Sequence, residues 1–176
     1  MRKSLIMIWF LCIEITLSAQ VYVTQTGNIQ ISGKYGDVDI SAVSAQLHMQ
    51  VNYDRAEINM RLVLPSLVTG NDSLNRLLRN QTDAEVHFSG KMNISYIQTK
   101  SHPRQKFLTA GTLTINGVKR PFSFNSVLEH FPAGNKSCNL TASFTINLDE
   151  FGIKTGPHEN MVRIKMNQLV LKRPGE

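Results

Sequence analysis

Histidines are the residues of this chain best suited to hold a metal ion or to move a proton near neutral pH. They are His48, His87, His102, His130 and His158. Neither of the close ligand spacings, His-x-His or His-Glu-x-x-His, occurs among them. His48 and His87 fall at the polar positions of alternating segments, so we expect both to face solvent or a hydrogen-bonding partner. The sequence therefore predicts no metal site.

Nucleophiles and acids show no catalytic pattern either. The chain has no Gly-x-Ser-x-Gly elbow and no glycine loop that would cradle phosphate. Cys138 opens an apolar strand pattern, which favours a buried and inert thiol over a reactive one. The acids are scattered at turns and strand ends, where they would be solvated or, for Asp149, cap a turn; they are Asp37, Asp39, Asp149 and Glu150. We therefore expect no cofactor and no enzyme, although the fold could still assemble a pair of distant residues.

The N-terminus has the composition of a cleavable secretory signal. Basic residues at positions 2 and 3 precede an apolar run of about ten residues, shorter than the roughly twenty that a spanning helix needs. Small residues end the segment, so we expect cleavage after Ala19, with cleavage after Gln20 as the second choice. The expected mature domain spans 20–176 and is periplasmic or secreted. The mature chain has no candidate transmembrane segment and keeps only Cys138, which rules out an intrachain disulfide.

Apolar and polar residues alternate in segment after segment of the mature chain, as in strands that are wet on one face. Predicted strands lie at 45–52, 56–64, 84–90, 92–96, 112–115, 139–148 and 162–171. The clearest is 139–148, and the last strand places Val162, Ile164, Met166 and Val170 on one face. Asn116-Gly117 tolerates positive φ at both positions and predicts a hairpin that pairs 106–115 with 119–129.

One segment differs from the strands. In Asn71 to Asn80, Leu74, Leu77 and Leu78 have helical spacing behind an Asp72-Ser73 cap, which predicts a short helix over the sheet or at one end of it. About eight antiparallel strands with apolar inner faces must form two stacked sheets or close into a barrel. Periodicity alone does not choose between the two.

Two stretches in order then point to a known family. Residues 109–124 hold a glycine, a short apolar strand, a glycine turn and a second strand, and 144–153 end a late strand in an aspartate, aromatic, glycine and aliphatic run. Together with 84–90 they resemble the YceI-like family, in a compact branch. The chain departs from the family pattern at Asp83-Ala84, where a proline is usual, and matches weakly over 27–52. The resemblance implies a lipocalin-like, up-and-down barrel of about eight strands that is exported and binds isoprenoid or fatty-acyl chains.

Ten apolar residues on the predicted inner faces are candidates for the wall of a ligand site. They are Leu47, Met49, Met60, Leu62, Phe122, Phe124, Phe144, Ile146, Ile164 and Met166. A small barrel either fills its interior with side chains or holds one small ligand. The pattern alone favours a packed core, and the family resemblance makes a ligand wall equally well supported.

Charge bears on the choice of partner. The net charge is +6, but lysines and arginines are dispersed instead of clustered with aromatic residues, so we expect no nucleic acid. Basic residues near the C-terminus form either a positive rim for anionic head groups or an ordinary solvated face; they are Lys154, Arg163, Lys165, Lys172 and Arg173. We expect an apolar ligand. The alternative is a filled envelope module that contacts a partner through loops 65–83, 99–106 and 131–137. The oligomeric state stays open, a dimer included.

Overall fold

Antiparallel strands make up most of the computed structural model, which describes residues 20–35, 37–81, 84–97, 104–130, 137–154 and 160–172. Its long strands are β1 (Val21–Tyr35), β2 (Val38–Asn52), β3 (Glu57–Val63), β5 (Glu85–Met92), β6 (Gln105–Ile115), β7 (Val118–His130), β8 (Ser137–Asn147) and β9 (Met161–Lys172). Shorter elements are η1 (Leu64–Ser66), β4 (Val68–Thr69), α1 (Asp72–Arg79) and η2 (Leu148–Phe151). The predicted signal and the turn residues 131–135 and 156–157 lie outside the described residues, as do His102, His158 and Arg173.

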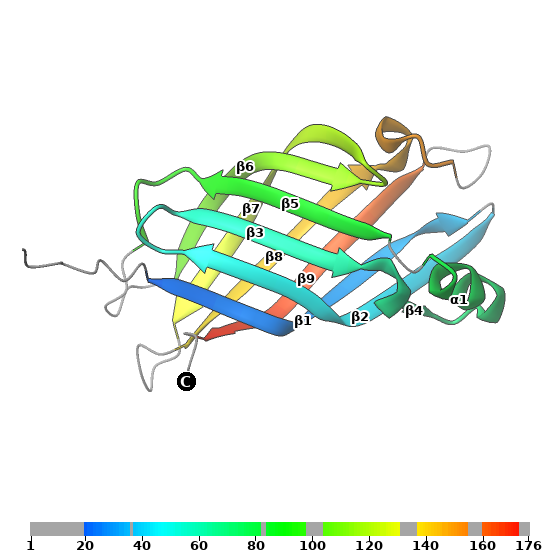
Figure 1. Ribbon diagram of the computed structural model, residues 1–176, viewed down its shortest axis with the longest axis horizontal. Helices are drawn as coiled ribbons and strands as arrows, with labels where there is room; N and C mark the ends of the chain where they lie inside the picture. Colours follow the sequence, from blue (N-terminus) through cyan, green and yellow to red (C-terminus); the bar gives the residue numbers. More distant parts are fainter. Residues whose placement is uncertain are drawn as a thin grey trace, which may run out of the picture.

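The sheet closes on itself (Figure 1). Each long strand pairs antiparallel with the next long strand, and β1 pairs with both β2 and β9. β4 adds to β2 as a two-residue extension through Ala42 and Val43. The fold is thus an up-and-down barrel of eight strands with one short helix, which confirms the predicted lipocalin-like barrel and excludes two stacked sheets.

The β6–β7 hairpin forms as its sequence predicts. Ile115 pairs with Val118, which leaves a two-residue loop, and Asn116 and Gly117 have φ angles of 50° and 76°. Positive φ at both loop positions is the geometry of a type I′ turn, whose twist matches that of the flanking strands. This turn fixes the register of the two strands that carry Phe122, Phe124 and Leu113.

Two local predictions were wrong. The strand predicted at 92–96 does not form, because β5 ends at Met92 and the residues that follow it are not in a strand. There the Asn93 side chain accepts a hydrogen bond from the Leu108 N–H (3.1 Å), and the Ile97 N–H donates to the Tyr53 carbonyl (2.7 Å). The helix is present, but its N-cap is Asn71, whose side chain accepts from the Leu74 N–H.

A β-bulge changes which residues of β9 face inward. Leu140 pairs with Leu169 while Ala142 pairs with Met166, so β9 carries one extra residue at this point. An extra residue reverses the facing of all residues beyond it. Ile164 and Met166 are buried as predicted, but beyond the bulge Leu171 is fully buried in place of Val170, which is only half-buried.

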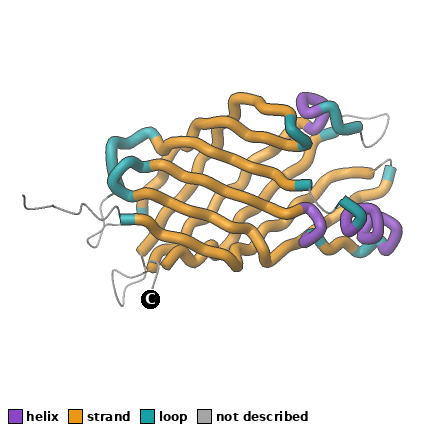
Figure 2. Tube along the Cα trace, viewed as in Figure 1, coloured by secondary structure: helices purple, strands orange, loops and turns teal. Residues whose placement is uncertain are grey.

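Two ends of the barrel differ in what fills them. At one end, here the packed end, the interior is filled by fully buried side chains that include Tyr22, Leu128, Leu140 and Leu171. The Tyr22 ring stacks on Tyr53 with a centroid distance of 4.2 Å. The helical elements gather at the opposite end, here the open end, where α1 and η2 lie (Figure 2).

Candidate functional site

A cavity of about 460 Å³ occupies the half of the barrel nearest the open end. Each long strand contributes at least one inward-facing side chain to the lining of this cavity. These are Ile29, Ile31, Leu47, Met60, Leu62, Val86, Phe88, Leu113, Ile115, Phe122, Phe124, Phe144, Ile146, Val162, Ile164 and Met166. The volume lies within the range of about 300–1,000 Å³ that is typical of small-molecule sites. The interior is therefore filled in one half and hollow in the other.

Four phenylalanines form one side of the cavity wall. The Phe144 ring lies 4.7 Å from that of Phe124 and 5.3 Å from that of Phe122, the latter in an edge-on arrangement. Phe88 meets Phe124 edge-on at 5.2 Å. Offset and edge-on arrangements at these distances are the ones that aromatic pairs prefer. The wall at this side is thus made of mutually packed aromatic rings, with the thioether side chains of Met60 and Met166 elsewhere in the lining.

Helix α1 covers part of the opening with its leucines. Leu74, Leu77 and Leu78 line the cavity, and the side chain of Asn75 fastens the helix to β4. Asn75 Oδ1 accepts from the Thr69 N–H (2.8 Å), and Asn75 Nδ2 donates to the Thr69 carbonyl (2.9 Å). This pair of bonds copies the pattern of a backbone ladder, so the helix is held against the sheet at its N-terminal half.

Nine of the ten predicted wall residues line the cavity. The exception is Met49, which is buried at 2% exposure but does not line the cavity. It shares the inner face of β2 with Leu47 and lies two residues closer to the packed end. The role of the nine in binding a ligand remains a prediction.

Sequence reasoning missed several parts of the wall. Alternation in β5 and β6 could have identified four of these wall residues. They are Val86, Phe88, Leu113 and Ile115. Ile29 and Ile31 of β1 alternate with Asn28, Gln30 and Ser32, but only over these five residues. β1 changes register on either side of Gly27, so its inward residues are even-numbered up to Thr24 and odd-numbered from Gly27 onward. These irregularities hide the alternation.

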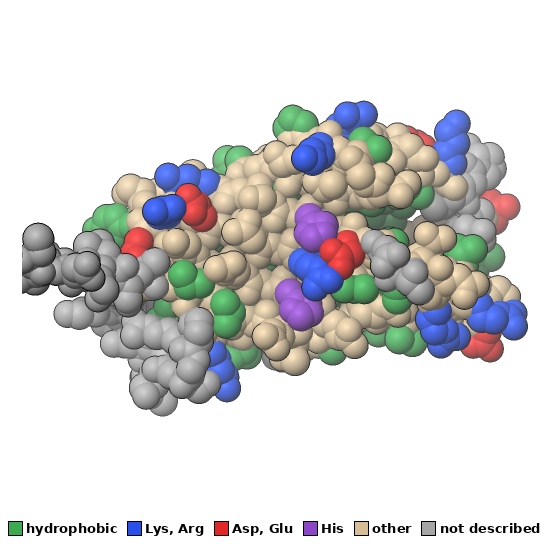
Figure 3. Space-filling model, in the orientation of Figure 1, with side chains coloured by type: hydrophobic (Ala, Val, Ile, Leu, Met, Phe, Trp, Pro, Cys, Tyr) green, Lys and Arg blue, Asp and Glu red, His purple; other side chains and the backbone are tan. Residues whose placement is uncertain are grey.

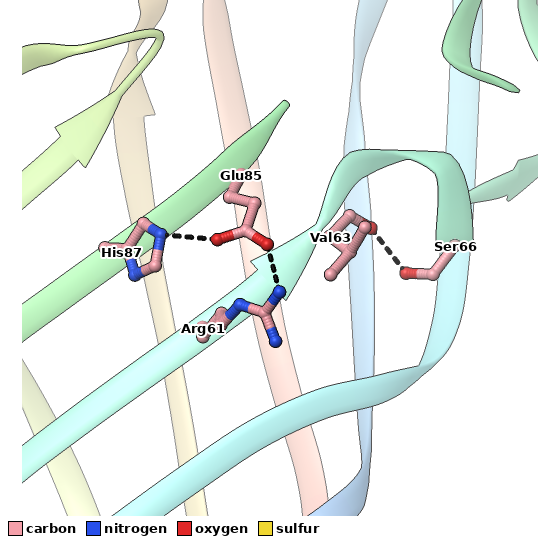
Figure 4. A network of polar contacts seen from close by, with 5 residues as sticks. All are labelled: Arg61, Val63, Ser66, Glu85 and His87. Atoms are coloured by element: carbon pink, nitrogen blue, oxygen red, sulfur yellow. Dashed lines mark hydrogen bonds and ion pairs between the residues drawn. The ribbon is translucent and has the colours of Figure 1, made fainter. Parts of the chain in front are cut away.

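Charged groups near the cavity are few. Among the described lining residues only Arg61 and Lys154 carry a charge. Arg61 forms an ion pair with Glu85 on the outer face of the barrel, and Glu85 Oε2 also lies 2.8 Å from His87 Nε2 (Figure 4). The hydrogen bond from Arg61, with a smaller contribution from His87, lowers the pKa of Glu85 from 4.5 to about 2.

The outer-face group belongs to the surface and not to the interior. Side chains of Arg61 and His87 are about half exposed, at 48% and 49%. Figure 3 shows histidine, basic and acidic side chains gathered on this outer face of the barrel. His48 and His87 are the cross-strand partners of Arg61 in β2 and β5. Within the described part of the chain, no three residues among His, Cys, Asp and Glu come together in a way that could hold a metal ion.

The basic residues near the C-terminus divide into two sets. Lys154 lines the cavity at the open end, just after η2. Arg163, Lys165 and Lys172 are exposed on the outer face of β9 and form an ordinary solvated face. In the described ranges, no helix is long and apolar enough to cross a bilayer.

Comparison with known proteins agrees with this geometry. A polyisoprenoid binding domain from Saccharophagus degradans superimposes with a TM-score of 0.69 at 12% identity, over 89% of this chain and 99% of that one. Burkholderia cenocepacia BcnA gives 0.61 at 16% identity, over 82% and 94%. The Campylobacter jejuni YceI protein gives 0.54 at 17% identity, over 82% and 85%. At these identities the likeness shows a shared fold alone, and no curated protein sequence matches the chain.

The sequence itself gives the family. The model of the YceI-like domain matches residues 14–169, which is most of the chain. This match includes all of β1 to β8, residues 161–169 of β9, and the helical elements η1, α1 and η2. It also covers the two stretches, 109–124 and 144–153, on which the predicted resemblance was based. The chain therefore belongs to the YceI-like family.

Proposed function

We propose that this protein binds one molecule with a long apolar chain, of isoprenoid or fatty-acyl type, inside the barrel. The observation that carries the proposal is the hollow half of the interior, about 460 Å³ in volume and lined by apolar side chains from every long strand. Transfer of a chain from water to such a wall is favourable by roughly 25 cal/mol per Å² of apolar surface buried. Similarity to a domain described as polyisoprenoid binding supports this class of ligand.

The proposed role is binding and not catalysis. An enzyme needs titratable or nucleophilic groups that converge on the place where substrate lies. The described lining residues include no Asp, Glu, His, Cys, Ser, Thr or Tyr. Cys138, the thiol of the mature chain, is fully buried and does not line the cavity. These features support a carrier or a sequestering protein.

We also propose that residues 1–19 direct export and that the domain over 20–176 acts in the periplasm or outside the cell. The basic start, short apolar run and small residues before Gln20 support this. The family match begins at residue 14, within the proposed signal. Intact-mass analysis of the protein recovered from a periplasmic extract tests the proposal. A chain that begins at Gln20 is expected, and a full-length chain confined to the cytoplasm would contradict it.

Ligand binding is tested on the purified mature protein. Native mass spectrometry after gentle purification is expected to show an apolar adduct, and extraction should release it for identification. Addition of a C16 fatty acid or of geranylgeraniol should raise the melting temperature, because a ligand that binds only the folded state stabilises it. A stripped protein that neither carries an adduct nor gains stability from either compound would overturn the proposal.

A matched pair of variants locates the binding to the cavity. Phe144→Trp adds bulk to the wall from a half-buried position and should weaken binding severalfold. Thr145→Trp adds the same ring to the neighbouring residue of β8, which is exposed on the outer face, and should leave binding unchanged. Equal affinities for the two variants would place the ligand elsewhere.

A further inference from the structure

The charge on the cavity wall has one sign. Among the described lining residues two carry a charge, Arg61 and Lys154, and both are cations. No described lining residue is an acid, and the remaining lining residues are apolar. A molecule that fills this cavity therefore meets apolar side chains along its length, and neither of the two charged residues in the described lining is an acid.

Arg61 already forms an ion pair with Glu85. Its guanidinium pairs with Glu85, which also contacts His87, and all three side chains face the outside of the barrel. Lys154, in contrast, forms no ion pair with any acid in the described part of the chain. Its ammonium group is thus the one charged group in the described lining that is left for a ligand.

The backbone next to Lys154 is held in place. Gly152 ends η2 with a φ of 71°, and the Ile153 N–H donates to the Leu148 carbonyl (3.1 Å). Asn160, which is 6% exposed, donates from Nδ2 to Asp149 Oδ1 (2.7 Å) and contacts the Ile153 carbonyl (3.4 Å). The carboxylate of Asp149 is therefore engaged by Asn160, and hydrogen bonds at Ile153 anchor the backbone that directly precedes Lys154.

We infer that the apolar molecule bound by this protein carries an anionic head group, a carboxylate or a phosphate, and that Lys154 binds that group at the mouth of the cavity. The inference rests on the proposed function and narrows its ligand class. An anionic amphiphile places its tail among the phenylalanines and its head beside the ammonium group. A neutral amphiphile of equal length gains only the first of these interactions.

The test compares charged and neutral ligands that have the same apolar tail. Dissociation constants are measured for palmitoleic acid and palmitoleyl alcohol, and for geranylgeranyl phosphate and geranylgeraniol, on the mature protein and on Lys154→Gln. The matched control is Lys165→Gln, which removes the same charge from the outer face of β9. Lys154→Arg keeps the charge. Because Lys154 and Lys165 are both exposed, none of these variants is expected to disturb folding.

The charged member of each pair should bind more tightly, by about two- to fivefold, the range of an ion pair at a partly exposed site. Lys154→Gln should remove this preference while Lys165→Gln and Lys154→Arg keep it, and added salt should reduce it. If the charged ligand binds more tightly than the neutral one in only one of the two pairs, that pair identifies the head group as a carboxylate or a phosphate. Equal binding of charged and neutral ligands, or a preference that survives Lys154→Gln, would overturn the inference but leave the proposed function standing. Failure of all four compounds to bind would instead refute the proposed function.

Discussion

The hydroxyl of Tyr53 donates a hydrogen bond to the sulfur of Cys138 at 2.7 Å, across the packed end of the barrel. Both residues have no solvent exposure. Tyr53 follows β2 and Cys138 belongs to β8, so the contact ties together two strands that are not neighbours in the sheet. These two side chains join Tyr22, Leu128, Leu140 and Leu171 in filling the packed end, and the cavity lies in the opposite half of the barrel.

The free energy of unfolding at alkaline pH should depend on the ionisation of the Cys138 thiol. Burial raises the pKa of Cys138 from 9 to about 12. The unfolded chain loses the thiol proton near pH 9 while the folded chain keeps it, so this contribution to stability is complete below pH 9 and declines as the pH rises toward 12. The free energy of unfolding should fall roughly 1 kcal/mol per pH unit more steeply for the natural chain than for Cys138→Ala between pH 9 and 11. Parallel slopes in urea unfolding would contradict the expectation.

Gly111 should tolerate no side chain. It pairs with Gly90 between β6 and β5, and a Cβ on Gly111 would lie 2.2 Å from the Ser89 carbonyl oxygen and 2.4 Å from the Gly90 Cα. Both are backbone atoms, so Gly111→Ala should destabilise the barrel by about 1–3 kcal/mol or more. Gly70→Ala is the control, because its Cβ would meet nothing within 4 Å. Chemical unfolding of both variants provides the measurement.

Two residues of one strand should differ in how much their truncation costs. Leu140 and Phe144 both point inward from β8, but Leu140 is fully buried at the packed end while Phe144 is half-buried beside the cavity. Leu140→Ala should cost about 2–5 kcal/mol because it opens a void in a packed region. Phe144→Ala should cost less, since its ring already borders open space. The reverse order in urea unfolding would indicate that the cavity is not hollow in solution.

Local opening of α1 should depend on Asn75. Asn75→Ala removes both bonds to the backbone of Thr69, so the amides of 72–80 should exchange with deuterium at least about tenfold faster by local unfolding, without a matching change in the barrel strands. Ser73→Ala is the control, since within the described residues its hydroxyl bonds to the exposed Arg76 side chain and not to the sheet. Hydrogen exchange read by mass spectrometry measures both. Uniform exchange across the two variants would show that other contacts hold the helix.

Carbon NMR of Glu85 should show a carboxylate that stays ionised to about pH 2. Because the Arg61 hydrogen bond is the main cause, Arg61→Gln should move the pKa of Glu85 up toward its ordinary value of 4.5, and His87→Gln should move it less. Since the folded pKa is lowered, the pair stabilises the barrel above about pH 4.5, and this contribution is lost as the pH falls through 2. An unchanged titration in Arg61→Gln would show that the ion pair does not form in solution.

Local rules were sufficient for much of the fold. The Asn116-Gly117 turn set the register of β6 and β7, and the alternation in 139–148 identified β8 with its correct inner face. The rules failed where one residue is inserted into a strand. The shifts around Gly27 and the bulge in β9 exchange the inner and outer residues, and neither leaves a mark in the composition.

The cavity could not have been predicted by the same means. Alternation tells which side chains face the interior, but it does not tell how much space separates them from the opposite wall. Leu47 and Met49 have the same facing and similar burial, yet only Leu47 borders the hollow half. Whether space remains depends on the whole ring of strands and on the elements at its two ends.

Closure of the ring through β1 and β9 has a consequence for how the chain folds. Every other neighbouring pair of long strands is consecutive in the chain and can form soon after both strands are synthesised. The pairing of Ile31 with Ile164 joins opposite ends of the sequence, so it demands the largest loop-closure entropy in the barrel. Until β9 is complete, β1 and β8 present unpaired edges to other chains. Pairing of β9 with β1 and β8 thus covers both edges and protects the folding protein from aggregation.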